Sequence, residues 1–278
     1  MFVRTAWIVA VLAAAAGAGA RPLKIVTTTQ DLAALARAVA GADAEVRSIS
    51  SGREDPHALQ ARPSFMLQAR DADLWIRVGL ELEIGWEGPV LDGARNPRIR
   101  PGQPGHLDAA SAARVLDVPS GPITRAMGDV HPLGNPHYWL DPLNGRRVAA
   151  RIAERLSQLD PARAGAFRER AAAFQRALDT RMFGAALLES RTAESLWAMT
   201  GDGSIAGLLS GGEAGGWAAA LAPLRGRSIV TYHRSWIYFA RRFGLRVAGE
   251  LEPKPGVPPS AAHLADLAAV LAQLRPAK

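Results

Sequence analysis

The chain has 278 residues and a hydrophobic content of 48%, enough for two lobes or one large globular domain. Its formal net charge is +7, but the arginines are spread along the sequence and form no basic stripe, so we expect no nucleic-acid partner. Because the sequence contains no cysteine, we expect no disulfides, no thiolate metal ligands and no lipid anchor on an N-terminal cysteine.

The first 20 residues have the pattern of a secretory signal peptide. Arg4 gives a positive start, and residues 7–16 form an apolar run too short to span a bilayer. Residues 18–20, Ala-Gly-Ala, match the small-residue pattern of a cleavage site. We therefore expect cleavage after Ala20 and a mature protein that is soluble, periplasmic and not inserted in the membrane.

The next part of the sequence alternates strands and helices. A β-branched run predicts a strand at residues 23–29, a helical pattern ends at Gly41, and a second strand follows at residues 46–49. Strand–helix–strand is the unit of a parallel sheet. Beyond it we expect a helix capped by Ser64 and a third strand at residues 72–78.

Residues 95–120 are rich in proline and glycine and predict short strands and loops. His106 lies in this region, and the sequence suggests no partner for it. Before the region, Trp86 and Leu91 indicate one more amphipathic helix.

Residues 135–142 read NPHYWLDP and form the most informative segment of the chain. His137 follows a proline, which stiffens the backbone, and Asn135 precedes that proline and is pushed toward an extended conformation. Asp141 predicts a helix N-cap with Pro142 at the first helical position. The imidazole is thus held on a rigid corner before a helix, as a metal site requires, although a buried structural histidine would show the same pattern.

The helix that follows this segment is expected to reach residue 159, and a second helix begins near Asp160. Apolar residues recur in this second helix every three or four positions, at Phe167, Ala171, Phe174, Leu178 and Met182. About 22 helical residues span about 33 Å, enough to join two lobes stiffly.

The last part of the sequence predicts a second, smaller α/β lobe. Residues 201–216 are rich in glycine and are expected to be loops. Residues 228–232 predict a strand, with His233 at its end. The remaining expected elements are a helix at residues 236–243, a strand at 246–249 and a helix at 261–274 capped by Ser260.

The fold class predicted from these elements is α/β, with two lobes that each contain a mainly parallel sheet flanked by helices and that are joined by one long rigid helix. The predicted domain limits are residues 1–20 for the signal peptide, 21–150 for the N-terminal lobe, 151–183 for the connecting helices and 184–278 for the C-terminal lobe.

Three histidines share one kind of placement. His57, His137 and His233 each lie at the end of a strand or on a rigid corner before a helix, where ligands of α/β sheets gather. Three imidazoles without a thiolate suit Zn²⁺, with a carboxylate or water in the fourth position. His263 lies inside a predicted helix and is expected to be at the surface or in packing, whereas the role of His131 stays open.

The sequence resembles the zinc- and manganese-binding solute receptors of bacterial ABC importers, the cluster A-I metal-binding family. The resemblance covers about residue 22 to the end. The matching motifs occur in the family's order: DPH at residues 55–57, RPS at 62–64, NPHYWLDP at 135–142, TYHRSWIYFARRFGL at 231–245 and EPKPGVPPSAAHLADL at 252–267.

The resemblance implies two α/β lobes, a long rigid connecting helix and a metal held between the lobes. By motif, the family's histidine ligands fall on His57, His137 and His233. Manganese receptors of the family usually carry glutamate at the position of His233, so histidine favours zinc over Mn(II).

This sequence departs from the family's pattern in two places. The His/Asp/Glu-rich loop of many zinc receptors is reduced here to residues 127–135. The tail that brings a final strand and an acidic fourth ligand is not present, so we expect an incomplete second lobe. Either the fourth ligand is then water or another carboxylate, with Glu250, Glu252 and Asp129 as candidates, or the gene product is truncated and poorly functional.

The function favoured by the sequence is high-affinity capture of Zn(II) in the periplasm and its delivery to the membrane permease of an ABC-type importer, by a monomeric protein that is not an enzyme. One alternative is a zinc-dependent hydrolase with three histidines and an open water position, although no HExxH motif or clear general base is found. A manganese receptor of the same family is the other alternative.

Overall fold

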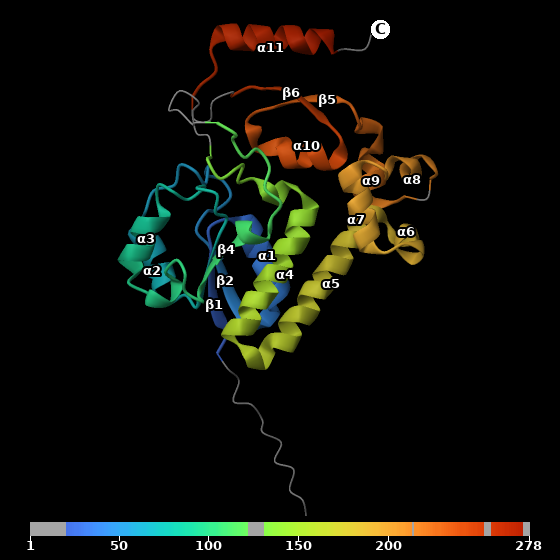
Figure 1. Ribbon diagram of the computed structural model, residues 1–278. Helices are drawn as coiled ribbons and strands as arrows, with labels where there is room; N and C mark the ends of the chain where they lie inside the picture. The colour runs from blue at the N-terminus through green and yellow to red at the C-terminus, as the bar shows by residue number, and fades with distance from the viewer. Residues whose placement is uncertain (1–20, 122–130, 213, 253–256, 275–278) are drawn as a thin grey trace, which may run out of the picture.

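The computed structural model of the chain describes residues 21–121, 131–212, 214–252 and 257–274. The predicted signal peptide and Asp129 therefore lie outside the described residues. The two α/β lobes are joined by a long helix, as the sequence predicts, and Figure 1 shows the larger N-terminal lobe below the smaller C-terminal one.

The N-terminal lobe is built on a four-stranded parallel sheet. Its strand order is β2-β1-β3-β4, and the register places Ile25 beside both Val46 and Leu74. The strands are β1 (Leu23–Thr27), β2 (Ala44–Ser48), β3 (Leu74–Arg77) and β4 (His106–Asp108).

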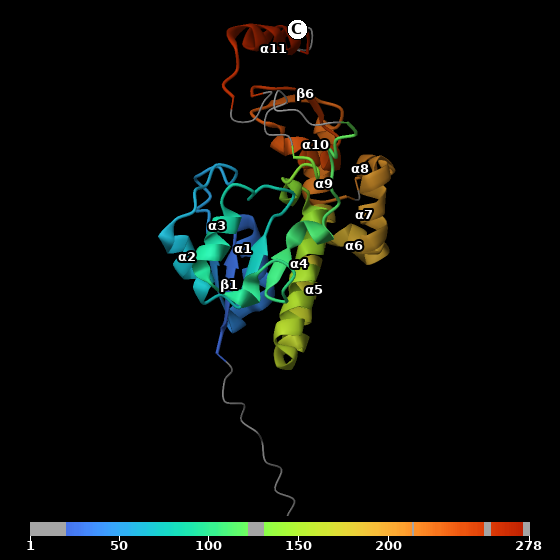
Figure 2. The ribbon, with the colours of Figure 1, turned by 60° about the vertical axis from the view of Figure 1, so that its left-hand side comes forward.

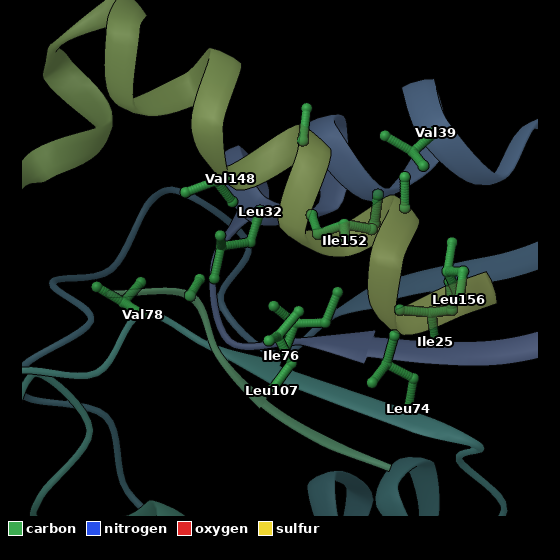
Figure 3. Close-up of a cluster of buried hydrophobic side chains, with 14 of the residues drawn as sticks. Ile25, Leu32, Val39, Leu74, Ile76, Val78, Leu107, Val148, Ile152 and Leu156 are labelled. Carbon is green, nitrogen blue, oxygen red and sulfur yellow. The ribbon is translucent and has the colours of Figure 1, made fainter. Parts of the chain in front are cut away.

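Helices cover both faces of this sheet because its strand residues alternate between two cores. Ile25 packs in one core with residues of α1 (Gln30–Ala40), α4 (Pro142–Leu159) and α5 (Ala164–Phe183), as Figure 3 shows in part. Val26 packs in the other core with residues of α2 (Pro63–Arg70) and α3 (Glu87–Ala94). Two buried faces are typical of a parallel sheet.

Local signals in the sequence set several helix ends. Asp141 caps α4 by accepting from the backbone N–H of Leu143, and Pro142 is the first helical residue, as predicted. Gly41 ends α1 with a φ of 58°. The predicted cap at Ser64 is wrong: α2 begins at Pro63, and Arg62 occupies the N-cap position, so the proline and not the serine defines the start.

Helix α5 belongs to both lobes. Its first half contributes Phe167 and Ala171 to the core of the N-terminal lobe. Its last turn contributes Met182 and Phe183 to a separate core that is formed with Trp197 and neighbouring helices. Figure 2 shows the helix running from one lobe to the other. At 20 residues it is about 30 Å long.

The C-terminal lobe consists of helices packed around the end of α5 and a two-stranded parallel sheet. The strands are β5 (Ser228–Thr231) and β6 (Arg246–Glu250), with α10 (Ile237–Phe243) between them. The last helix is α11 (Ala261–Gln273), capped by Ser260 as predicted. The remaining helices are α6 (Ala185–Ser190), α7 (Ala193–Asp202), α8 (Ala206–Ser210) and α9 (Gly216–Leu221).

The expectation of loops throughout residues 201–216 is wrong. Helix α7 continues to Asp202, and α8 follows after one turn. Leu196 and Ile205 are almost fully buried against the end of α5, so tertiary packing stabilises helices that the glycine content disfavours. No helix in the described part of the chain has both the length and the apolar character needed to cross a bilayer.

Candidate metal centre

The fold brings together the three histidines singled out by sequence. His57 lies in the segment between β2 and α2, His137 lies just before α4, and His233 follows the end of β5. One ring nitrogen from each lies within 4.8 Å of the other two. Two of the three segments belong to the N-terminal lobe and one to the C-terminal lobe, so the cluster lies where the lobes meet.

The spacing of the nitrogens fits a small cation. His57 Nε2 and His137 Nε2 are 3.3 Å apart. Two nitrogens bound tetrahedrally to Zn²⁺ at about 2.0–2.1 Å lie roughly 3.3 Å from each other. The ring of His233 is 5.2 Å from that of His137 and 6.2 Å from that of His57, centroid to centroid. The three donors are thus close enough to share one ion.

Local hydrogen bonds hold the turn that carries His57. Asp55 Oδ1 accepts from the backbone N–H of His57 at 2.9 Å, which closes a short Asx turn around Pro56. The indole N–H of the buried Trp86 donates to the carbonyl of Pro56 at 2.9 Å. These bonds attach the exposed loop to the core and orient the imidazole.

His137 is the most buried member of the cluster, with 8% of its surface exposed. Asn135 Oδ1 accepts from its backbone N–H at 3.0 Å and lies 2.9 Å from its Nδ1. The next residue, Tyr138, is anchored in the core by a hydrogen bond from its hydroxyl to the carbonyl of Val78 at 2.9 Å. The imidazole is therefore fixed from both sides along the chain.

His233 leaves the end of β5 on an extended backbone. The neighbouring segment is held by hydrogen bonds from the backbone of Leu251 to Thr231 at 2.8 Å and of Glu252 to Tyr232 at 2.7 Å. His233 Nδ1 is buried and has no hydrogen-bond partner among the described residues. A buried nitrogen without a partner is costly unless a ligand uses it.

The electrostatics of the cluster favour a neutral imidazole at His137. Burial, together with the nearby rings of His57, His233 and His131, lowers the pKa of His137 to about 2. A metal ion needs the unprotonated nitrogen. His137 is therefore in the state that a metal requires across the physiological pH range.

The described carboxylates that the sequence offered as a fourth ligand lie outside the three-histidine group. Glu250 instead faces Arg234, at 3.7 Å. His131 lies near the group, with its ring centroid 4.9 Å from that of His57. The sequence left the role of His131 open, and the fold brings it beside the cluster without making it one of the three converging donors.

Two other residues differ from what the sequence suggested. His106 does lie near a carboxylate: it is in β4 with its Nε2 3.4 Å from the buried carboxylate of Glu87, which also binds Arg77 at 2.7 Å. Asn135 was noted only for its position before a proline, yet it contacts His137 directly. An asparagine side chain can accept from the backbone N–H two residues later to form an Asx turn, and this was the available signal.

The fold resembles solved solute-binding proteins. A crystal structure of ZnuA superposes with a TM-score of 0.63 at 23% identity, covering 91% of this chain and 79% of that one. The periplasmic zinc-binding protein TroA from Treponema pallidum gives a TM-score of 0.60 at 22% identity, covering 91% and 76%. The chain thus has the two-lobed architecture of metal-binding receptors with a long connecting helix.

The particular family follows from the sequence. The profile described as "Zinc-uptake complex component A periplasmic", ZnuA, matches residues 25–182, and the chain belongs to this family. The high-affinity zinc uptake system protein ZnuA of Paracoccus denitrificans is 27% identical over 292 residues, which cover 91% of this chain and 76% of that protein.

Other relatives align over shorter stretches. The ZnuA protein of Brucella abortus is 29% identical over 128 residues, which are 46% of this chain and 29% of that protein. The iron-binding protein YfeA of Yersinia pestis is 28% identical over 188 residues, covering 66% and 55%. Relatives named for different metals therefore align with this sequence.

Proposed function

We propose that this protein captures one Zn²⁺ ion in the periplasm through His57, His137 and His233 and delivers it to the membrane permease of an ABC-type importer. The observation that carries the proposal is the convergence of three imidazole nitrogens within 4.8 Å at the junction of the two lobes. Membership of the ZnuA family supports zinc as the cargo and a transporter as the partner.

The chemistry of the donors supports zinc over manganese. Imidazole nitrogen suits Zn²⁺, whereas Mn²⁺ prefers carboxylate, carbonyl and water oxygens. The described members of the cluster are three histidines. Three protein ligands and a fourth position taken by water or by a further residue complete a tetrahedral zinc site. We propose that the protein acts as a monomeric receptor and not as an enzyme.

Zinc titration of the purified metal-free protein tests the proposal. We expect one tightly bound Zn²⁺ per chain, and we expect affinity to fall by more than tenfold in each of His57→Ala, His137→Ala and His233→Ala. His263→Ala is the control, because His263 lies on α11 and bonds the backbone carbonyl of Glu250. Unchanged affinity in all three site variants contradicts the assignment.

The same preparations separate a receptor from a hydrolase. The zinc-loaded protein is assayed with an activated ester, and the three histidine variants serve as blanks. A receptor shows no turnover above these blanks. Zinc-dependent turnover that disappears in the variants would overturn the proposal that the protein is not an enzyme.

A further inference from the structure

Asn135 uses its backbone and side-chain polar groups in hydrogen bonds, although only 8% of its surface is exposed. Its backbone N–H donates to Leu116 at 2.9 Å, and its carbonyl accepts from the Tyr238 hydroxyl at 2.6 Å. In its side chain, Oδ1 accepts from the backbone N–H of His137 at 3.0 Å, and Nδ2 donates to the carbonyl of Arg234 at 2.9 Å. Two of these partners are in the C-terminal lobe.

The contacts of Asn135 determine which nitrogen of His137 carries the proton. The backbone N–H of His137 can only donate, so it must face Oδ1 of Asn135. The carbonyl of Arg234 can only accept, so it must face the amide nitrogen. His137 Nδ1 lies 2.9 Å from the same Oδ1, which has no proton to give. His137 Nδ1 must therefore carry the hydrogen.

The other ring nitrogen then carries a lone pair and no hydrogen. A neutral imidazole has one proton, so Nε2 of His137 is the acceptor, and it points at the cluster, 3.3 Å from His57 Nε2. A histidine that donates Nδ1–H to a fixed acceptor presents Nε2 to a metal in one orientation. Asn135 thus selects the metal-binding form of the ring before a metal arrives.

The same amide also reaches the third histidine's segment. Arg234, whose carbonyl accepts from Asn135 Nδ2, directly follows His233 in the chain. Its side chain is held by Asp117 at 2.7 Å, so the turn is fixed from two directions. One side chain therefore sets the proton of His137 in the N-terminal lobe and the position of the turn that carries His233 in the C-terminal lobe.

We propose that Asn135 is a positioning residue for metal capture: it holds His137 in the Nδ1–H tautomer and ties that ring to the turn that carries His233. This inference rests on the proposed zinc site but is tested separately from it. The side-chain oxygen Oδ1 of Asn135 selects the tautomer, and the side-chain nitrogen Nδ2 joins the lobes.

The test compares three variants. Asn135→Leu removes both functions, and Asn135→Asp keeps the acceptor for His137 but loses the donor to Arg234. Asn96→Leu is the matched control, because Asn96 is also a buried asparagine whose amide donates to two backbone carbonyls, those of Ala69 and Ala72, away from the histidines.

Two measurements are made on each protein. Nitrogen-15 chemical shifts of the His137 ring in the metal-free protein report its tautomer, and competition with a chelating dye reports zinc affinity. We expect the Nδ1–H form in the unmodified protein and in Asn135→Asp. In Asn135→Leu we expect loss of this preference and an affinity about 10–100-fold weaker, with Asn135→Asp between the two.

The control separates positioning from stability. Asn96→Leu is expected to lower the melting temperature while leaving the tautomer and zinc affinity unchanged. An Nε2–H ring in the unmodified metal-free protein overturns the inference whether or not zinc binds. So does an Asn135→Leu variant that is less stable yet keeps both tautomer and affinity. If Asn135→Leu does not fold, Asn135→Ala replaces it with the same expectations. Failure of the unmodified protein to bind zinc counts against the proposed function alone.

Discussion

Arg242 and Asp141 form a buried bidentate ion pair that joins the lobes. The guanidinium Nε lies 2.7 Å from Oδ1 of Asp141, and a terminal nitrogen lies 2.6 Å from Oδ2. The other terminal nitrogen donates to Thr200 Oγ1 at 2.6 Å, and the group stacks over Trp197 at 5.4 Å. Asp141 is also the N-cap of α4, four residues after His137, so this pair fixes α10 to the segment of the metal cluster.

Removing one partner of this pair is expected to cost about 3–5 kcal/mol in the free energy of unfolding, because the other charge stays buried and unpaired. Arg242→Met and Asp141→Asn are measured by chemical denaturation, and the double variant is expected to cost less than the sum of the two. Arg151→Met is the control, because Arg151 pairs with Glu154 near the surface and should change stability by about 0.5 kcal/mol or less. A double variant that costs as much as the sum of the two single variants would show that the pair is not coupled.

The metal-free protein is expected to lose stability as the pH falls below about 6.5. An imidazole in an unfolded chain has a pKa of about 6.5, whereas burial lowers the pKa of folded His137 to about 2. At a pH between these two values, the unfolded state binds a proton at His137 and the folded state does not. His137 therefore lowers the free energy of unfolding by up to about 1.4 kcal/mol per pH unit, or about 2 kcal/mol from pH 7.5 to pH 5.

Replacing His137 by glutamine removes this titration. Denaturation of metal-free protein at several pH values from 7.5 to 5 should give a shallower dependence on pH in His137→Gln than in the unmodified chain. His263→Gln is the control and should keep the original slope. Equal slopes in all three proteins would mean that folded His137 accepts a proton near its ordinary pKa.

Replacing His233 by glutamate is expected to shift metal preference toward manganese. A carboxylate oxygen suits Mn²⁺ better than imidazole does, and it weakens the preference for Zn²⁺. Competition between the two ions should show at least a tenfold fall in the ratio of zinc to manganese affinity. His263→Glu adds the same charge away from the cluster and should leave this ratio unchanged; an equal fall there would point to net charge as the cause.

The small sheet of the C-terminal lobe is expected to exchange its amide hydrogens faster than the large sheet. The strands β5 and β6 are only partly buried, whereas the last three residues of β1 and the first three of β3 are buried. Local opening takes less free energy where few apolar contacts are lost. Hydrogen exchange read by mass spectrometry should show earlier labelling of residues 228–231 than of residues 74–77. Equal protection would contradict this ranking.

The sequence predicted well those features that depend on neighbouring residues. Runs of β-branched residues predicted the parallel strands, apolar periodicity predicted the long α5, and the Asp141-Pro142 pair predicted the start of α4. Strand ends and prolines indicated the three histidines that the fold brings together. That these histidines bind the metal, and the domain limits at residues 150 and 183, stay predictions.

The features that the sequence did not predict depend on contacts between distant segments. Helix α8 forms in a glycine-rich stretch because Ile205 packs against the end of α5. His106 meets Glu87 only because β4 joins the sheet beside β3. The link from Asn135 to Arg234 spans 99 positions, and no local pattern encodes it.

Helix α5 determines how the two lobes can move relative to each other. Because its two halves pack in different cores, a tilt of the helix would move one lobe relative to the other. A turn of about 4° at one end of a rod about 30 Å long displaces the other by about 2 Å, which is the length of a zinc–nitrogen bond. A tilt of this size would therefore shift His233 relative to His57 and His137 by about one zinc–nitrogen bond length, while both lobes keep their internal packing.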